Sequence, residues 1–194
     1  MSQWGSAGPP PAAYSRVSDA ERFRPLHDVA LGMLRRIEAT FSVERFEGYG
    51  LDGELERRDL GRPTIKLVPR DTRAAPLAIA FSVFPGLFLR VGYWTIDAFP
   101  GCGCDACAET ADGEARRLAG LVDDVTAGRF LEEVRLPRLG SGWWQSELGA
   151  PGHHHSTRRA RVGRARAREM LDAAGRSSNA WAPWPRLDVP ASDI

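Results

Sequence analysis

The chain has 194 residues, a formal net charge of +1 and 43% hydrophobic residues. This length suits one domain with tails, and the composition is typical of a globular protein. The near-neutral charge excludes a global field that would attract nucleic acid or an anionic membrane, so any such binding requires a local patch. Lys66 is the only lysine, and arginine supplies the other basic residues, as expected from the codon bias of a GC-rich genome.

The sequence predicts neither an export signal nor a membrane span. Its N-terminus lacks a basic start followed by an apolar run. The most apolar stretch, residues 77–91, is too short to cross a bilayer and contains Pro85 and Gly86. Three cysteines clustered in one segment also differ from the even, dispersed set of a secreted disulfide framework. We therefore expect a cytoplasmic protein.

The N-terminal region begins with a predicted disordered tail. Residues 1–17 are rich in Gly, Ser, Ala and Pro and have little to bury. Ser18 and Glu21 then have the spacing of a capping box, in which each side chain satisfies the other residue's backbone N–H. From residue 26 to residue 41, apolar side chains recur every three or four positions, which predicts a helix. His27 falls off the apolar stripe and is expected in solvent.

The clearest β-hairpin signal spans residues 77–94. Large and small side chains alternate along 77–84 and again along 87–94, and Pro85-Gly86 between the two arms is typical of a turn. Four shorter strands are predicted at 43–46, 64–68, 130–136 and 143–148. Two further helices are predicted at 113–127 and about 162–174. Residues 149–160 are expected to form a polar loop.

These elements predict an α+β fold, in which two or three helices cover a small antiparallel sheet built around the hairpin. Neither a repeat nor a linker divides the chain, so residues 18–186 are expected to form one domain and residues 187–194 a C-terminal tail. Trp181 and Trp184 are expected to anchor the proline-rich end of the domain on the sheet. Their indole N–H groups are expected to donate to carbonyl oxygens.

Cys102, Cys104 and Cys107 form the sharpest chemical motif in the sequence. A Cys-x2-Cys pair lets two thiolates face one ion, and the glycines beside these cysteines permit a tight turn. Zinc takes four ligands in such sites, so the motif predicts a zinc knuckle that lacks one ligand. His154, in a run of three histidines, is the candidate for the fourth ligand, and Asp105 or a water are the alternatives.

Three interpretations of the cysteines stay open. They hold a metal, or they are reduced thiols that pack as small apolar side chains. In the third interpretation, Cys104 and Cys107 form a redox or catalytic pair with a lowered thiol pKa. The histidine run also has a simpler interpretation as solvated polar residues on a loop.

Several short motifs follow one another in a characteristic order. They are Phe84-Pro85-Gly86, Val91-Gly92-Tyr93-Trp94, Phe99-Pro100, Cys102-Gly103-Cys104-Asp105-Ala106-Cys107 and Trp181-Ala182-Pro183-Trp184-Pro185-Arg186. This order resembles an uncharacterised family of actinobacterial proteins of unknown function, over about residues 14–186. The cysteine string is the most specific part of the resemblance, whereas the histidine run is not part of that family's pattern. The resemblance implies a single domain from an arginine-rich bacterial source, and it implies no activity.

Residues 158–168 carry six arginines, a patch that suits the phosphates of nucleic acid. No nucleic-acid motif accompanies them, so a solvated helix face is the preferred interpretation and nucleic acid is not the expected partner. Motifs of nucleotide-binding loops, serine hydrolases and zinc proteases are absent from the sequence. Asp123 and Asp124 are adjacent on a predicted helix and point to different sides, which is poor geometry for an acid–base pair.

The sequence therefore leaves function open between three hypotheses. The preferred one is a non-enzymatic binding or regulatory domain with a structural, zinc-binding cysteine knuckle and an unidentified protein or small-molecule partner. The alternative is a thiol- or metal-dependent enzyme that uses the same cysteines. A weaker alternative is nucleic-acid binding through residues 158–168.

Overall fold

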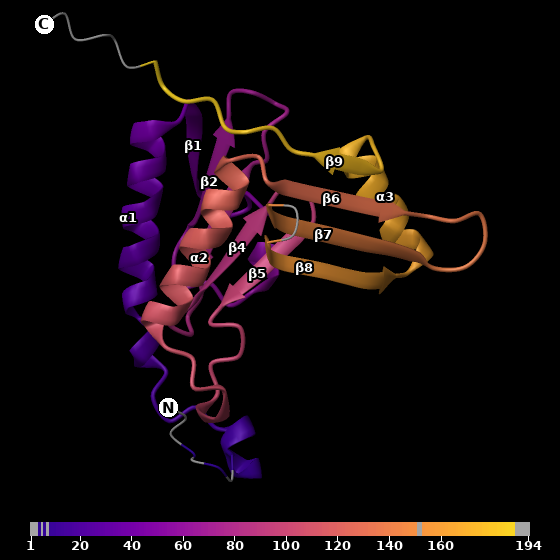
Figure 1. The fold of residues 1–194 in the computed structure, drawn as a ribbon. Coiled ribbons are helices and arrows are strands. Elements are labelled where there is room, and N and C mark those ends of the chain that lie inside the picture. Colours follow the sequence, from indigo (N-terminus) through magenta and orange to yellow (C-terminus); the bar gives the residue numbers. More distant parts are fainter. Residues whose placement is uncertain (1–3, 5, 7, 151–152, 189–194) are drawn as a thin grey trace, which may run out of the picture.

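The computed structural model describes residues 4, 6, 8–150 and 153–188, with the backbone alone at residues 150 and 153–155. Within them the chain forms two antiparallel sheets and three α-helices, which confirms the predicted α+β class. Two helices cover one face of the first sheet, and the third lies beside the second sheet (Figure 1). None of the helices in the described ranges combines the length and apolar character needed to cross a bilayer.

The first sheet is a five-stranded meander in the order β1-β2-β3-β4-β5. Its strands are β1 Val43–Gly48, β2 Thr64–Pro69, β3 Leu77–Phe81, β4 Leu87–Val91 and β5 Thr95–Phe99. Strands β3 and β4 confirm the predicted hairpin, and β1 and β2 lie where weaker strand signals were found. Strand β5 was not predicted, because two of its three buried side chains, Thr95 and Asp97, are polar.

Helices α1 (Pro25–Thr40) and α2 (Ala111–Thr126) pack on the same face of this sheet (Figure 1). Both confirm helices predicted from apolar periodicity. Leu34 of α1 and Leu118 of α2 are fully buried in one core with Ile79 of β3. Helix α2 begins after Thr110, whose hydroxyl accepts a hydrogen bond of 3.1 Å from the N–H of Gly113.

His27, in the first turn of α1, is buried, so the expectation that it lies in solvent is wrong. Its Nε2–H donates to the carbonyl oxygen of Gly86 at 2.8 Å, and its ring contacts the edge of Phe81. The turn between β3 and β4 reaches over the first turn of the helix and supplies an acceptor that periodicity within the helix cannot reveal. Gly86 is required in this turn, since a Cβ there would lie 2.4 Å from the carbonyl oxygen of Phe99.

The second sheet has four strands in the order β8-β7-β6-β9. They are β6 Phe130–Arg135, β7 Gly142–Ala150, β8 His153–Val162 and β9 Ser178–Ala180, and α3 (Arg164–Ala174) follows β8. The prediction of a polar loop at 149–160 is wrong, because most of this segment belongs to β8. Strand β8 pairs antiparallel with β7, with Val162 opposite Gly142. This strand has almost no apolar alternation, so pairing with β7 decides its structure.

The C-terminal segment crosses between the two sheets and buries Trp181 and Trp184, which confirms their expected anchoring role. The Trp181 ring stacks on Phe130 at a centroid distance of 6.4 Å. Backbone hydrogen bonds from Trp181 to Phe130 and from Trp184 to Thr126 hold the segment in place. The expectation that the two indole N–H groups donate to carbonyl oxygens is wrong, since neither group has a hydrogen-bond acceptor among the described residues.

Candidate metal centre

The cysteine segment connects the end of β5 to the start of α2. After Phe99 the chain passes through Gly101 and Gly103, then makes a 3-10 turn over Asp105–Cys107. Gly103 has a φ of +80° and lies against the Phe84 ring, so the predicted need for glycine is confirmed at this position. The backbone N–H of Cys107 donates to the carbonyl of Cys104 at 3.3 Å, which closes the turn between these two cysteines.

The turn gathers the three cysteine sulfurs into one cluster. The Sγ atoms of Cys102, Cys104 and Cys107 all lie within 4.8 Å of one another, and those of Cys104 and Cys107 are 3.4 Å apart. Sulfurs bound to one tetrahedral zinc at about 2.3 Å are about 3.8 Å apart. The cluster therefore fits three corners of such a site, and three cysteines can hold a metal ion. Cys104 is buried, whereas Cys102 and Cys107 are exposed.

Hydrogen bonds between the thiols shift the pKa values of Cys104 and Cys107 in opposite directions. The pKa of Cys104 is lowered, chiefly by a hydrogen bond with the Cys102 thiol. The pKa of Cys107 is raised to about 12, first by its hydrogen bond with Cys104 and next by that with Cys102. Cys104 thus gives up its proton more readily than Cys107 does. A bound cation would displace the thiol protons, because the thiolate is the metal ligand.

The Glu109 side chain holds the backbone of the cysteine turn in place. Its carboxylate accepts hydrogen bonds of 3.1 Å from Gly101 N–H, 3.1 Å from Cys102 N–H and 2.6 Å from Gly103 N–H. Three successive N–H groups around one anion form a nest that holds the turn in shape. Sequence reasoning missed Glu109, although an acidic residue two positions after the last cysteine was its visible signal.

The N-terminal segment packs against the same turn. Asp105 accepts hydrogen bonds from the N–H of Ser18 at 2.8 Å, the hydroxyl of Ser18 at 2.7 Å and Nε of Arg16 at 2.9 Å. These partners lower the pKa of Asp105 to about 2, with the Ser18 N–H as the largest cause. The prediction of a capping box is therefore wrong. Ser18 donates its hydrogen bonds to Asp105, and the Glu21 carboxylate pairs with Arg24.

Residues 8–17, assigned to a disordered tail from their composition, include a 3-10 turn at Pro11–Ser15 with Ala13 buried. The carbonyl of Arg16 accepts a hydrogen bond of 2.8 Å from Asp105 N–H. Arg22 donates to the carbonyl of Gly103 at 2.9 Å. The cysteine turn thus lies between this N-terminal segment, the end of β5 and the start of α2 (Figure 1).

The fourth ligand stays a prediction. The side chain of His154 lies outside the described part of the chain, and its strand, β8, runs beside the middle of the molecule while the cysteine turn extends beyond the sheet (Figure 1). Asp105 turns its carboxylate towards Ser18 and Arg16. Among the described residues, the cluster with metal-binding geometry consists of the three cysteines.

A cavity of about 370 Å³ opens beside the cluster. Cys102 is one of its lining residues, and Phe84, Phe88 and Phe99 give it an apolar wall. The enzymatic alternative requires a concave site beside the cysteines, and this cavity is such a site, although Cys104 and Cys107 do not line it.

The arginines of residues 158–168 lie on β8 and α3, and several have protein partners. Arg158 pairs with the buried carboxylate of Asp97 and donates to the carbonyl of Ile96. Arg164 donates to the carbonyl of Pro137 at 2.7 Å. Arg166 pairs with Glu54 and Glu169. Much of the predicted patch thus has a role inside the fold.

The fold and the site define an α+β protein with two antiparallel sheets and a three-cysteine cluster suited to a metal ion. The chain belongs to the family described as "Family of unknown function (DUF6226)", whose model matches residues 1–188. No match was found among curated proteins or among solved structures.

Proposed function

We propose that this protein is a non-enzymatic binding or regulatory domain whose cysteine turn holds a structural zinc ion. The observation that carries the proposal is the clustering of the three Sγ atoms within 4.8 Å. Thiolate sulfur is a preferred zinc ligand, and zinc sites with three Cys ligands and one further donor are common structural sites. His154 is the proposed fourth ligand, with a water as the alternative.

The surroundings of the cluster favour a structural role over a catalytic one. Asp105 and Gly103 hold the N-terminal segment through Ser18 and Arg22, and Glu109 holds the turn against the start of α2. A metal at this point would fix the turn between β5 and α2, to which the distant N-terminal segment is hydrogen-bonded, and structural zinc stabilises small folds in this way. The three cysteines form no disulfide, which also favours the reducing cytoplasm as the location of the protein. The proposal includes an actinobacterial source.

Metal analysis of the untagged protein, purified under reducing conditions, tests this proposal. We expect about one zinc per chain and a lower melting temperature after treatment with a chelator. A variant with all three cysteines changed to serine should contain no zinc and melt at one temperature with or without chelator. A chain that is metal-free after zinc reconstitution, and as stable as the triple variant, would overturn the proposal.

A thiol-dependent enzyme remains the second candidate, because the cavity beside Cys102 and the lowered pKa of Cys104 suit a reactive thiol. Of the two candidate thiols, Cys104 and Cys107, the lowered pKa favours Cys104, so iodoacetamide should alkylate Cys104 in the metal-free protein faster than it alkylates a free peptide thiol. Alkylation of Cys104 at or below the peptide rate would reject this candidate.

A further inference from the structure

A second cavity, of about 440 Å³, lies on the face of the five-stranded sheet opposite α1 and α2. Its floor is a cross-strand row formed by Lys66 of β2, Ala78 of β3 and Arg90 of β4. Strands in a sheet are about 4.8 Å apart, so the two cations are separated by about two strand spacings with only a methyl group between them. The row thus leaves open space between two positive side chains.

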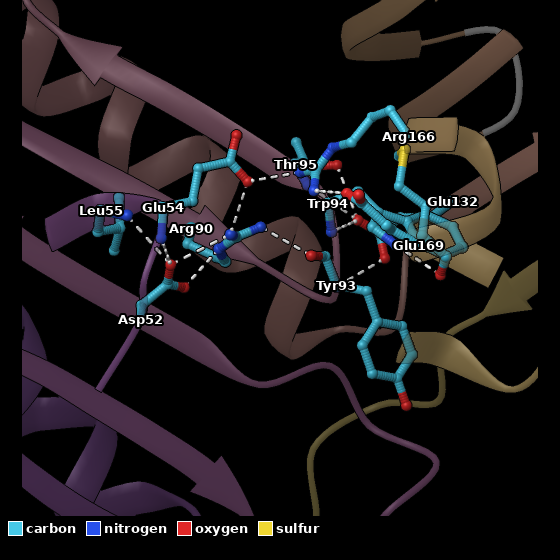
Figure 2. Close-up of polar contacts among 11 residues, drawn as sticks. Asp52, Glu54, Leu55, Arg90, Tyr93, Trp94, Thr95, Glu132, Arg166 and Glu169 are labelled. Carbon is cyan, nitrogen blue, oxygen red and sulfur yellow. Dashed lines mark hydrogen bonds and ion pairs between the residues drawn. The ribbon is translucent and has the colours of Figure 1, made fainter. Parts of the chain in front are cut away.

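The walls of the cavity come from parts of the chain that are distant in sequence. One wall is the loop at residues 52–57, another is the turn at Tyr93 and Trp94, and the third is α3 with Arg166, Glu169 and Met170. Figure 2 shows Asp52, Glu54 and the carbonyl of Tyr93 around Arg90. The volume falls within the usual range of about 300–1,000 Å³ for small-molecule sites.

Ion pairs hold Arg90 in place before any ligand arrives. Its guanidinium pairs with Asp52 at 2.5 Å and with Glu54 at 3.0 Å, and it donates to the carbonyl of Tyr93 at 2.7 Å (Figure 2). Arg166 reaches across from α3 to Glu54 at 3.1 Å. Side chains that are already fixed lose less conformational entropy when a ligand binds.

The charges that line the cavity are not fully compensated. Asp52, Glu54 and Glu169 are all paired with arginine. Lys66 is half-buried, yet its ammonium has neither a hydrogen-bond nor an ion-pair partner among the described residues. Arg57 also lines the cavity and has no acidic partner in the described part of the chain. Arg57 is exposed, so water can solvate these cations, and an anion from outside can replace that water with charge-assisted hydrogen bonds.

The rest of the lining is apolar. The indole N–H of Trp94 donates to the carbonyl of Met170 at 3.2 Å, so the polar edge of this ring is already satisfied. Tyr93, Pro76 and Ala173 complete the apolar surface. A ligand must therefore combine an anionic group with a flat or apolar part, because aromatic and thioether side chains contact such groups well.

We propose that this cavity binds a small organic anion, with its charged oxygens at Lys66 and Arg57 and its apolar part against Tyr93, Trp94 and Met170. The proposal extends the binding role proposed above by naming a ligand class. It is independent of the metal, because the cavity includes none of the three cysteines. A failure here leaves the zinc measurement unaffected, and a metal-free protein leaves this site unaffected.

Because Lys66 is the only lysine of the chain, its labelling by trinitrobenzenesulfonate can be followed at one peptide by mass spectrometry. The labelling rate is measured with benzoate, phenyl phosphate or benzyl alcohol added at constant ionic strength. We expect at least one of the two anions to slow labelling saturably by about tenfold, as charge-assisted hydrogen bonds predict, and the neutral alcohol to have no effect. Protection by benzoate indicates a carboxylate ligand, and protection by phenyl phosphate indicates a phosphate ligand.

Two tryptophan substitutions on exposed positions of α3 locate the protected site. Ala173 lines the cavity, whereas Ala165 does not. Ala173→Trp should fill the cavity and remove the protection, and Ala165→Trp should keep it. The proposal is overturned if neither anion slows the labelling, if benzyl alcohol protects as well as the anions do, or if the two variants behave alike.

Discussion

The Glu132 carboxylate of β6 accepts a hydrogen bond of 2.9 Å from the backbone N–H of Trp94, in the turn between β4 and β5. The same carboxylate accepts from the N–H groups of Tyr93 and Thr95 and from the Thr95 hydroxyl (Figure 2). Glu132 is fully buried, so these bonds join the two sheets through a desolvated acidic group. Burial raises the pKa of Glu132, and the hydrogen bonds from Tyr93, Trp94 and Thr95 oppose that rise.

Glu132→Gln should lower the free energy of unfolding by about 3 kcal/mol, because one oxygen acceptor becomes an amide donor facing backbone N–H groups. Glu133, next along β6, pairs with the exposed Arg135. Glu133→Gln should therefore cost less than about 0.5 kcal/mol. Urea unfolding of both variants measures the difference, and equal losses would contradict the role given to Glu132.

Glu109→Gln should weaken zinc binding by about tenfold, because the nest of N–H groups that shapes the cysteine turn loses its anion. Competition with a coloured zinc chelator measures the affinity. Asp112→Asn is the matched control, since Asp112 is also acidic and lies nearby but is exposed in the first turn of α2. If Asp112→Asn weakens binding as much as Glu109→Gln does, a general charge effect explains the result and the nest does not.

Arg158→Met and Arg168→Met distinguish a structural arginine from a solvated one within the same segment. Arg158 pairs with Asp97, which is 3% exposed and also contacts Arg117. Loss of Arg158 should cost about 2 kcal/mol, because a buried carboxylate loses one of its two cations. Arg168 is exposed, so its loss should change the unfolding free energy by less than about 0.5 kcal/mol. Thermal unfolding of the two variants checks this order.

His27 should make stability depend on pH. Burial lowers the pKa of His27 below its ordinary value of 6.5, against the hydrogen bond to Gly86. The unfolded chain therefore accepts a proton more readily than the folded protein. The contribution of His27 is present above about pH 6.5 and is lost as pH falls through the folded pKa.

Comparing unfolding free energies at pH 7.5 and 5.5 tests this expectation. His27→Gln keeps a donor for the Gly86 carbonyl and does not titrate, so this variant should lose less stability between the two conditions than the native chain does. An identical loss in both proteins would show that His27 is not the titrating group.

Local pattern was sufficient for the elements that carry a clear period. The apolar stripe located α1, the alternation around Pro85 and Gly86 located β3 and β4, and the glycines beside the cysteines indicated a turn that gathers their sulfurs. Each of these depends on residues close together in the chain, whose spacing fixes which face they share. The sequence also identified Trp181 and Trp184 as anchors, because large aromatic side chains near a chain end seek burial.

Only tertiary structure decided which distant groups became partners. The sequence did not show that β8 pairs with β7, that Ser18 binds Asp105, or that Glu132 reaches Trp94. The cavity with Lys66 likewise requires the first sheet, the loop at residues 52–57 and α3 to be placed together before its charges can be compared. A polar side chain gives no periodic signal of its own, and its energy depends on the donor or acceptor that packing brings within about 3 Å.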